Sequence, residues 1–227
     1  MTISFKGAQF PPDIILMSVR WYLAYPLSYR HVEELMEERG VWLDHATVQR
    51  WVVKYSPLLE EAFHRPKRAV AVSWRMDETY IKIKGHWYYL YRAVDKQGQT
   101  IDFLLTEHRD ERAAKRFLTK AIRRHGVPEK ITIDGSAANK AAIESYNEEH
   151  GTAIEIRQIK YLNNIVEQDH RAVKRVTRPM LGFKAFYAAR RTLTGIALLH
   201  MLKKKQRVGA EGPDAPSAIE QFYALAA

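Results

Sequence analysis

The sequence contains no cysteine, so disulfide bonds and thiolate metal sites are excluded. It also lacks a long hydrophobic run, because residues 193–202, the longest, are interrupted by Thr194, Gly195 and His200. That run is too short to span a bilayer, and residues 1–13 lack the apolar segment of a signal peptide. We therefore expect a cytoplasmic protein without a membrane span, in which residues 193–202 form a buried helix.

Positive charge is unevenly distributed along the chain. Residues 160–207 contain 12 of the 36 Lys and Arg residues but only two of the 26 Asp and Glu residues, so the remainder is balanced. A local excess of this size is typical of a surface that binds a polyanion such as nucleic acid. A basic helix pair that is merely well solvated has the same composition.

Three short helices are predicted in residues 12–56. Ser28 and Asp44 are candidate N-caps of the second and third helices, and Gly40 would end the second. Two short helices joined by a tight turn with Gly are typical of a helix-turn-helix, although a plain three-helix bundle has the same pattern. Residue types that contact bases and phosphates occupy outward positions of the third helix: His45, Thr47, Gln49, Arg50 and Lys54.

The rest of the chain has the pattern of an α/β protein. Three β-rich runs with short connections predict an antiparallel meander, and helices and strands then alternate. This order fits a mixed sheet with helices on its faces. Residues after Gly209 are expected to be loosely held. The predicted strands are 69–83, 85–95, 100–108, 129–135 and 153–159, and the predicted helices are 110–125, 138–150, 163–178 and 184–205.

Three carboxylates are candidates for chemistry. Asp77 interrupts a strand, where Asp is disfavoured, and Asp134 ends the strand ITID, where ligands of α/β sheets gather. Glu167 lies in the basic helix, and Lys174 follows two turns later on the same face. Oxygen ligands without Cys suit Mg²⁺ or Mn²⁺, and two such ions catalyse phosphoryl transfer. Ordinary explanations also exist, since Asp134 could cap a turn and Glu167 could pair with Arg171.

Several long runs, in the same order, resemble bacterial insertion-sequence transposases of the IS-six (twenty-six-like) family. They include WRMDETYIKIKG, ITIDGSAANKAAI, RQIKYLNNIVEQDHRAVKR and LGFKAF, and the resemblance extends from residue 4 to residue 207. It implies an RNase H-like fold and a DDE triad that falls on Asp77, Asp134 and Glu167, with the family's basic residue on Lys174. The interval between Asp134 and Glu167 is slightly shorter than usual, and Gly135-Ser136 replaces the frequent Lys-Ala.

The domains expected from the sequence are a helix-turn-helix domain in residues 1–58, a linker in 59–68, an RNase H-like DDE catalytic domain in 69–208 and a C-terminal tail in 209–227. The resemblance implies a DNA transposase that uses two Mg²⁺ or Mn²⁺ ions. It would cut double-stranded DNA at the element's terminal inverted repeats and transfer the 3′-hydroxyl to target DNA, giving a cointegrate-type product. A homodimer or larger assembly at the bacterial nucleoid is expected, with DNA backbone bound by Arg171, Lys174, Arg175 and Arg178.

Two alternatives stay open. One is a catalytically silent helix-turn-helix regulator with a decayed nuclease fold, which the presence of all three carboxylates argues against. The other is a related integrase or nuclease that acts on different DNA ends. Glu78 neighbours Asp77 but alternates to the opposite face of the strand, so we interpret it as a supporting or structural residue.

Overall fold

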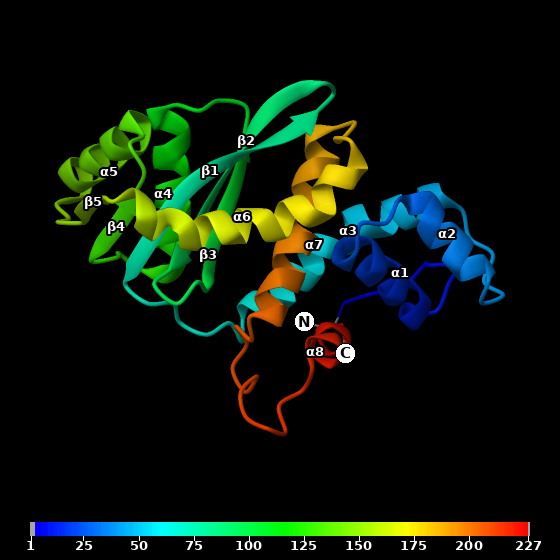
Figure 1. Ribbon diagram of the computed structural model, residues 1–227. Helices are drawn as coiled ribbons and strands as arrows, with labels where there is room; N and C mark the ends of the chain where they lie inside the picture. The colour runs from blue at the N-terminus through cyan, green and yellow to red at the C-terminus, as the bar shows by residue number, and fades with distance from the viewer. Residues whose placement is uncertain (1–2, 227) are drawn as a thin grey trace. The chain divides into compact units, whose positions relative to one another are not determined.

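The computed structural model describes residues 3–226, and the chain divides into two compact units (Figure 1). The first unit contains the chain up to Arg68 and the chain from Val173 onwards, and the second contains Ala69–Ala172. Residues 173–208, which we expected to continue the catalytic domain, cluster with the N-terminal helices in the first unit. The functional boundaries of the domains stay predictions.

A five-stranded sheet with the order β3-β2-β1-β4-β5 forms the centre of the second unit. Strands β1, β2 and β3 are antiparallel neighbours, β4 is parallel to β1, and β5 is parallel to β4. The predicted meander and the predicted α/β class with a mixed sheet are confirmed. The strands are Ser73–Ile83 (β1), His86–Asp95 (β2), Thr100–Thr106 (β3), Lys130–Ile133 (β4) and Glu155–Gln158 (β5).

One face of this sheet is covered by helices α4 (Glu111–His125) and α5 (Ala137–His150). Alternate residues of β1, Trp74 and Met76, are buried on this face and belong to the same apolar cluster as Phe117 of α4. The pattern follows from strand geometry, since successive side chains point to opposite sides of a sheet. This face therefore contains the apolar core of the unit.

The other face is crossed by α6 (Asn164–Thr177), which follows the short 3₁₀ helix η1 (Lys160–Asn163) (Figure 1, yellow). Asp77 in β1 and Arg92 in β2 are opposite each other in the ladder, so their side chains share this face. Arg92 forms a buried ion pair with Asp169 of α6. Polar contacts therefore hold α6 on the sheet.

The first unit is helical, and its N-terminal part has the predicted caps. The hydroxyl of Ser28 accepts a hydrogen bond from the N–H of His31 at 3.0 Å, and the carboxylate of Asp44 accepts one from the N–H of Ala46 at 3.1 Å. Gly40 has φ +73°, which glycine adopts readily, and it lies in the turn between the two helices. The helices are Pro12–Ala24 (α1), Tyr29–Glu37 (α2), His45–His64 (α3), Phe186–Lys203 (α7) and Ala218–Ala224 (α8), with a 3₁₀ turn at Arg178–Met180 (η2).

Two details of the first unit differ from the prediction. Helix α3 continues through Pro57 to His64, because Leu59 and Phe63 extend its buried stripe at helical spacing. The segment after Gly209, expected to be loosely held, contains α8, in which Phe222 is fully buried. A capping box begins α8, and its S-x-x-E signature was visible at residues 217–220.

Helix α7 is a core helix of the first unit, as the sequence predicted for residues 193–202. Its buried residues include Leu193, Ile196 and Leu198. A Cβ atom at Gly195 would lie 2.4 Å from Leu23 and 2.7 Å from Ser56, so glycine permits close contact with α1 and α3. Within residues 3–226, none of the helices has the length and apolar character needed to cross a bilayer.

Candidate active site

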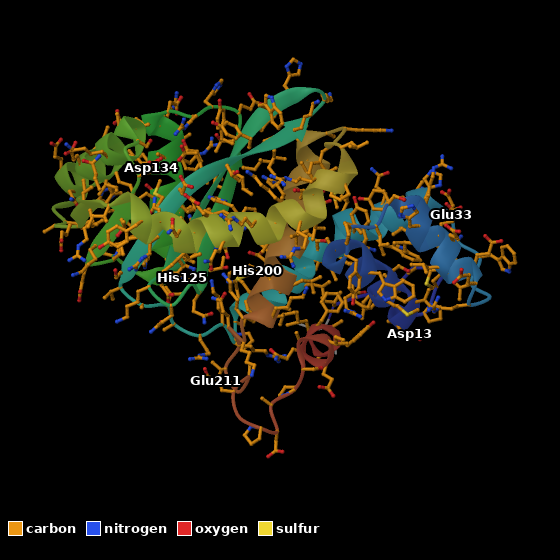
Figure 2. The ribbon with its side chains drawn as sticks, viewed as in Figure 1. Asp13, Glu33, His125, Asp134, His200 and Glu211 are labelled. Atoms are coloured by element: carbon orange, nitrogen blue, oxygen red, sulfur yellow. The ribbon has the colours of Figure 1, made fainter. Side chains whose placement is uncertain are left out.

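The strand register brings two of the predicted carboxylates to the same level. Strands β1 and β4 are parallel neighbours, and Arg75 lies opposite Thr132. Asp77 and Asp134 each follow two residues after this last pair, so they lie equally far beyond the paired part of the two strands. Asp134, which is labelled in Figure 2, comes directly after the end of β4. Its Oδ1 accepts a hydrogen bond from the N–H of Ser136 at 2.9 Å. Asp134 can therefore both cap this turn and occupy the position that was predicted for it in the site.

Helix α6 supplies the third carboxylate. The Nε2 atom of His170 lies 3.3 Å from Oδ2 of Asp77, which fixes the side of α6 that faces β1. Glu167 is three residues before His170, so it lies on the same side of the helix, one turn earlier. At the start of the helix, the amide of Asn163 approaches the carbonyl of Met76 at 3.5 Å. These contacts turn Glu167 toward the strand that carries Asp77.

The rotation of α6 is fixed by a buried polar cluster. The Nε of Arg92 donates to Oδ2 of Asp169 at 2.6 Å, and the hydroxyl of Thr100 lies 3.2 Å from Oδ1 of the same carboxylate. The side chains of Arg92 and Asp169 are each only 1% exposed. Since a buried charge is costly without its partner, Asp169 is confined to this position. Asp169 lies between Glu167 and His170 in the sequence, so this contact also orients both of them.

Glu78 is held on the opposite side of β1. Its carboxylate forms an ion pair with the Nε of Arg109 and accepts a hydrogen bond from the side-chain amide of Asn139 at 3.0 Å. Burial, followed by the charge of Glu78, raises the pKa of Tyr91, which is the cross-strand neighbour of Glu78. The geometry agrees with the expectation that Glu78 is a supporting residue rather than a member of the triad.

The donor set fits a hard divalent cation. Asp77, Asp134 and Glu167 offer carboxylate oxygens, and all three are half-buried. Within residues 3–226, none of them forms an ion pair with Lys or Arg, so their negative charge is available to a cation. Their oxygens come from three separate elements and do not all lie within 4.8 Å of one another.

Another acidic cluster lies in the first unit. Glu33, Asp44 and His45 have ligand atoms within 4.8 Å of one another, the only such group of three in the described part of the chain (Figure 2 labels Glu33). His45 Nδ1 lies 3.1 Å from Glu33 and 2.9 Å from Asp44. Because Asp44 already caps α3, the cluster is explained by contacts between α2 and α3.

The predicted DNA-contacting residues differ in their exposure. Gln49, Arg50 and Lys54 are exposed on α3, whereas Thr47 and His45 are half-buried. Arg50 donates to the hydroxyl of Thr47 at 2.7 Å, and His45 is held as described above. On the segment that begins with α6, Lys174 is half-buried, and three residues are exposed: Arg171, Arg175 and Arg178.

Comparisons with known proteins identify the family. Residues 71–206 match a family described as a DDE domain. The chain is also 40% identical over 205 residues to the transposase for insertion sequence-like element IS431mec of Staphylococcus aureus, covering 89% of this chain and 90% of the relative. The chain belongs to the IS-six family of DDE transposases. The transposase of element IS257 in transposon Tn4003 of the same species has the same identity and coverage.

Solved structures with a related arrangement are retroviral integrases. The HTLV-2 integrase catalytic core domain in complex with magnesium (trimeric form) is 14% identical with a TM-score of 0.48, covering 68% of this chain and 99% of that chain. The catalytic core domain of BIV integrase is 18% identical with a TM-score of 0.47, covering 68% and 95%.

Family membership makes this DDE transposase an enzyme that acts on DNA with a divalent metal ion. Sequence reasoning missed the supporting contacts of the site, namely Arg92 with Asp169 and Glu78 with Arg109 and Asn139. Arg92 carried one signal, because a cation inside the otherwise apolar strand YYLYRAVD needs a buried partner. Nothing in the sequence indicates which carboxylate that partner is.

Proposed function

We propose that Asp77, Asp134 and Glu167 form the DDE triad and hold two Mg²⁺ or Mn²⁺ ions. The observation that supports this assignment is that Asp77 and Asp134 each lie two residues beyond the last pair of the neighbouring parallel strands β1 and β4, with Glu167 on the side of α6 that faces β1. When bound, the cations activate an attacking oxygen and stabilise a leaving oxygen in phosphoryl transfer. His170 orients the Asp77 carboxylate, and Lys174, two turns after Glu167, binds a DNA phosphate.

The reaction proposed for this site is hydrolysis of one strand at each end of the insertion sequence. The freed 3′-hydroxyl then joins target DNA at the same site, which gives a cointegrate-type product. The described Ser and Tyr residues have no base arranged to activate them, so the chain need not act as a covalent nucleophile. The triad also disfavours the catalytically silent regulator.

The test is strand transfer by the purified protein on a duplex that carries the end sequence of its element. Transfer should require Mg²⁺ or Mn²⁺ and stop in excess EDTA. Asp134→Asn and Glu167→Gln should each abolish transfer while end binding, measured in the same buffer, is retained. Activity that persists in EDTA, or in all triad variants, would refute the mechanism. Cleavage of unrelated duplexes at equal rates would instead favour a nuclease.

We also propose that the helix-turn-helix recognises the element's terminal inverted repeats through α3. Three exposed side chains on that helix, Gln49, Arg50 and Lys54, suit base and phosphate contacts, with Thr47 and His45 beside them. Arg50→Ala should weaken end binding in competition with random duplex, whereas Glu61→Ala, an exposed change elsewhere on α3, should not. Unchanged end selection by Arg50→Ala together with Lys54→Ala would contradict the assignment.

A separate proposal concerns the DNA backbone. Arg171, Arg175 and Arg178 are exposed and follow Glu167, as does Lys174, so we assign them to sequence-independent phosphate contacts. Neutralising Lys174 and Arg178 should weaken binding to all sequences about equally and reduce its salt dependence. A loss confined to one sequence, with the salt dependence unchanged, would refute this assignment.

The active assembly is proposed to be a homodimer or larger at the bacterial nucleoid, because two element ends are processed together and one chain has one triad. The apolar face of α7 is core of the first unit, so it does not provide the interface. Light scattering with and without end DNA tests the assembly. A monomer under both conditions would refute it.

A further inference from the structure

We propose that Arg109 is a further substrate-binding residue of this transposase, which binds a phosphate of the DNA strand held at the catalytic carboxylates. Glu78 and Asn139 are its positioning residues. The inference rests on the proposed function of the triad. It also gives a role to Glu78, the neighbour of Asp77, which would position Arg109 on the opposite face of β1.

Arg109 lies at the surface, but the two residues that hold it, Glu78 and Asn139, are buried. Its partner Glu78 has a side chain that is only 4% exposed, although Arg109 itself is 41% exposed. Asn139, which is fully buried, donates its amide to the second carboxylate oxygen of Glu78 at 3.0 Å. In this series of contacts, Asn139 is therefore fixed in the core, Glu78 links it to Arg109, and Arg109 reaches solvent.

The contact to Glu78 uses only the Nε of Arg109. Among residues 3–226, the structure shows no other hydrogen-bond acceptor for this guanidinium, so its two terminal nitrogens remain available. A guanidinium has five N–H donors in a planar fork that matches a phosphate. Fixing the fork through Nε reduces the entropy that is lost when the remaining donors bind a ligand.

The turn after β4 connects the support of Arg109 to the triad. Oγ of Ser136 accepts a hydrogen bond from the N–H of Asn139 at 3.4 Å, and the N–H of Ser136 donates to Oδ1 of Asp134 at 2.9 Å. Burial is the largest single effect on the pKa of Arg109 and lowers it. The charge and the hydrogen bond of Glu78, with smaller contributions from Tyr80 and Asp134, together outweigh burial, so the pKa is raised. Through Glu78 and Asn139, Arg109 is therefore held near the turn that carries Asp134, without forming an ion pair with Asp134. A DNA phosphate approaching the triad is repelled by its carboxylates, and a fixed cation beside Asp134 offsets that repulsion.

An exposed ion pair with no function would contribute little to stability and nothing to DNA binding. The two explanations differ in which measurement changes when Arg109 is replaced. Arg109→Gln removes the charge, and Arg109→Lys keeps the charge but removes the fork. Arg123→Gln is the matched control, because Arg123 is exposed at the opposite end of α4, the helix that follows Arg109.

The experiment measures strand transfer by the full chain in Mg²⁺ with a pre-cleaved end duplex, and with duplexes that each carry one neutral methylphosphonate. We expect Arg109→Gln to lower kcat/KM by about 10- to 100-fold, the loss typical of a hydrogen-bonded charge, with Arg109→Lys intermediate and Arg123→Gln unchanged. One methylphosphonate position should reduce the wild type to the level of Arg109→Gln and leave Arg109→Gln itself unaffected. Thermal unfolding of each variant reports its folding, and Arg109→Lys preserves the test if Arg109→Gln does not fold.

Equal kcat/KM for wild type and both Arg109 variants would overturn the inference. The inference would also be overturned if every methylphosphonate lowered kcat/KM of Arg109→Gln by the same factor as it lowers kcat/KM of the wild type. Arg109 would then contact none of those phosphates. Failure of the wild type to transfer any strand is a different result, because it refutes the proposed function and not the role of Arg109 alone.

Discussion

The two faces of the central sheet are built from different interactions. On the face covered by α4 and α5, buried Trp74, Met76 and Ile131 make apolar contacts. On the face crossed by α6, Arg92 and Asp169 form a buried ion pair. Apolar packing tolerates small shifts, whereas an ion pair fixes distance and direction. The face that carries Asp77, the proposed catalytic carboxylate, therefore has a buried ion pair between α6 and the sheet, whereas the other face is mainly apolar apart from the contacts of Glu78 with Arg109 and Asn139. This difference can be tested by mutation.

The largest expected effect separates two neighbours on β1. Asp77→Asn removes a charged oxygen ligand on the α6 face and should lower strand transfer by about a thousandfold or more, while end binding survives. Glu78→Gln changes the other face and should retain far more activity, because it disturbs only the support of Arg109. Rates of strand transfer measured side by side decide the point. Equal inactivity of the two variants would show that the choice between them is wrong.

The next effect breaks the ion pair of the α6 face. Arg92→Met leaves Asp169 buried without its partner and should lower the free energy of unfolding by about 3–5 kcal/mol, as measured by urea denaturation. Arg92→Met combined with Asp169→Leu should recover most of that stability, because no buried charge remains.

The double variant separates the stability of the fold from the positioning of Glu167. It should stay poorly active although it is stable. The ion pair that fixes the rotation of α6 is gone, and the apolar side chains that replace it do not fix the direction of Glu167. Wild-type rates in the double variant would mean that the ion pair contributes stability without positioning the site.

The smallest effect concerns the apolar face. Ile131→Val removes one buried methylene from β4 and should cost about 0.5–1.5 kcal/mol in the free energy of unfolding. Strand transfer by the folded protein should be unchanged, because no contact of α6 is altered. A rate loss comparable to that of the stable double variant would show that both faces position the site equally.

Much of this fold was predictable because local patterns carry it. The caps at Ser28 and Asp44, the meander and the alternation that separates Asp77 from Glu78 all follow from residues close in sequence. The continuation of α3 past Pro57 was missed because a proline after a helix was interpreted as its end. The buried stripe of Leu59 and Phe63 instead extends the helix.

The supporting contacts of the site could not be predicted for a different reason. Arg92 and Asp169 are 77 residues apart, and Glu78 and Asn139 are 61 apart. Any of the chain's 26 carboxylates could serve as the partner of a buried arginine. Only the packing of α6 and α5 on opposite faces selects Asp169 for one contact and Asn139 for the other.

The pairing of β1 with β4 has a consequence for synthesis of the enzyme. The meander β1–β3 is contiguous, so it can fold early, but β4 joins β1 across 57 residues and α6 must follow. During translation, a nascent chain therefore displays Asp77 long before Glu167 has left the ribosome. A chain that ends before Glu167 lacks one of the three proposed triad carboxylates, so such a partial product cannot form the complete proposed site.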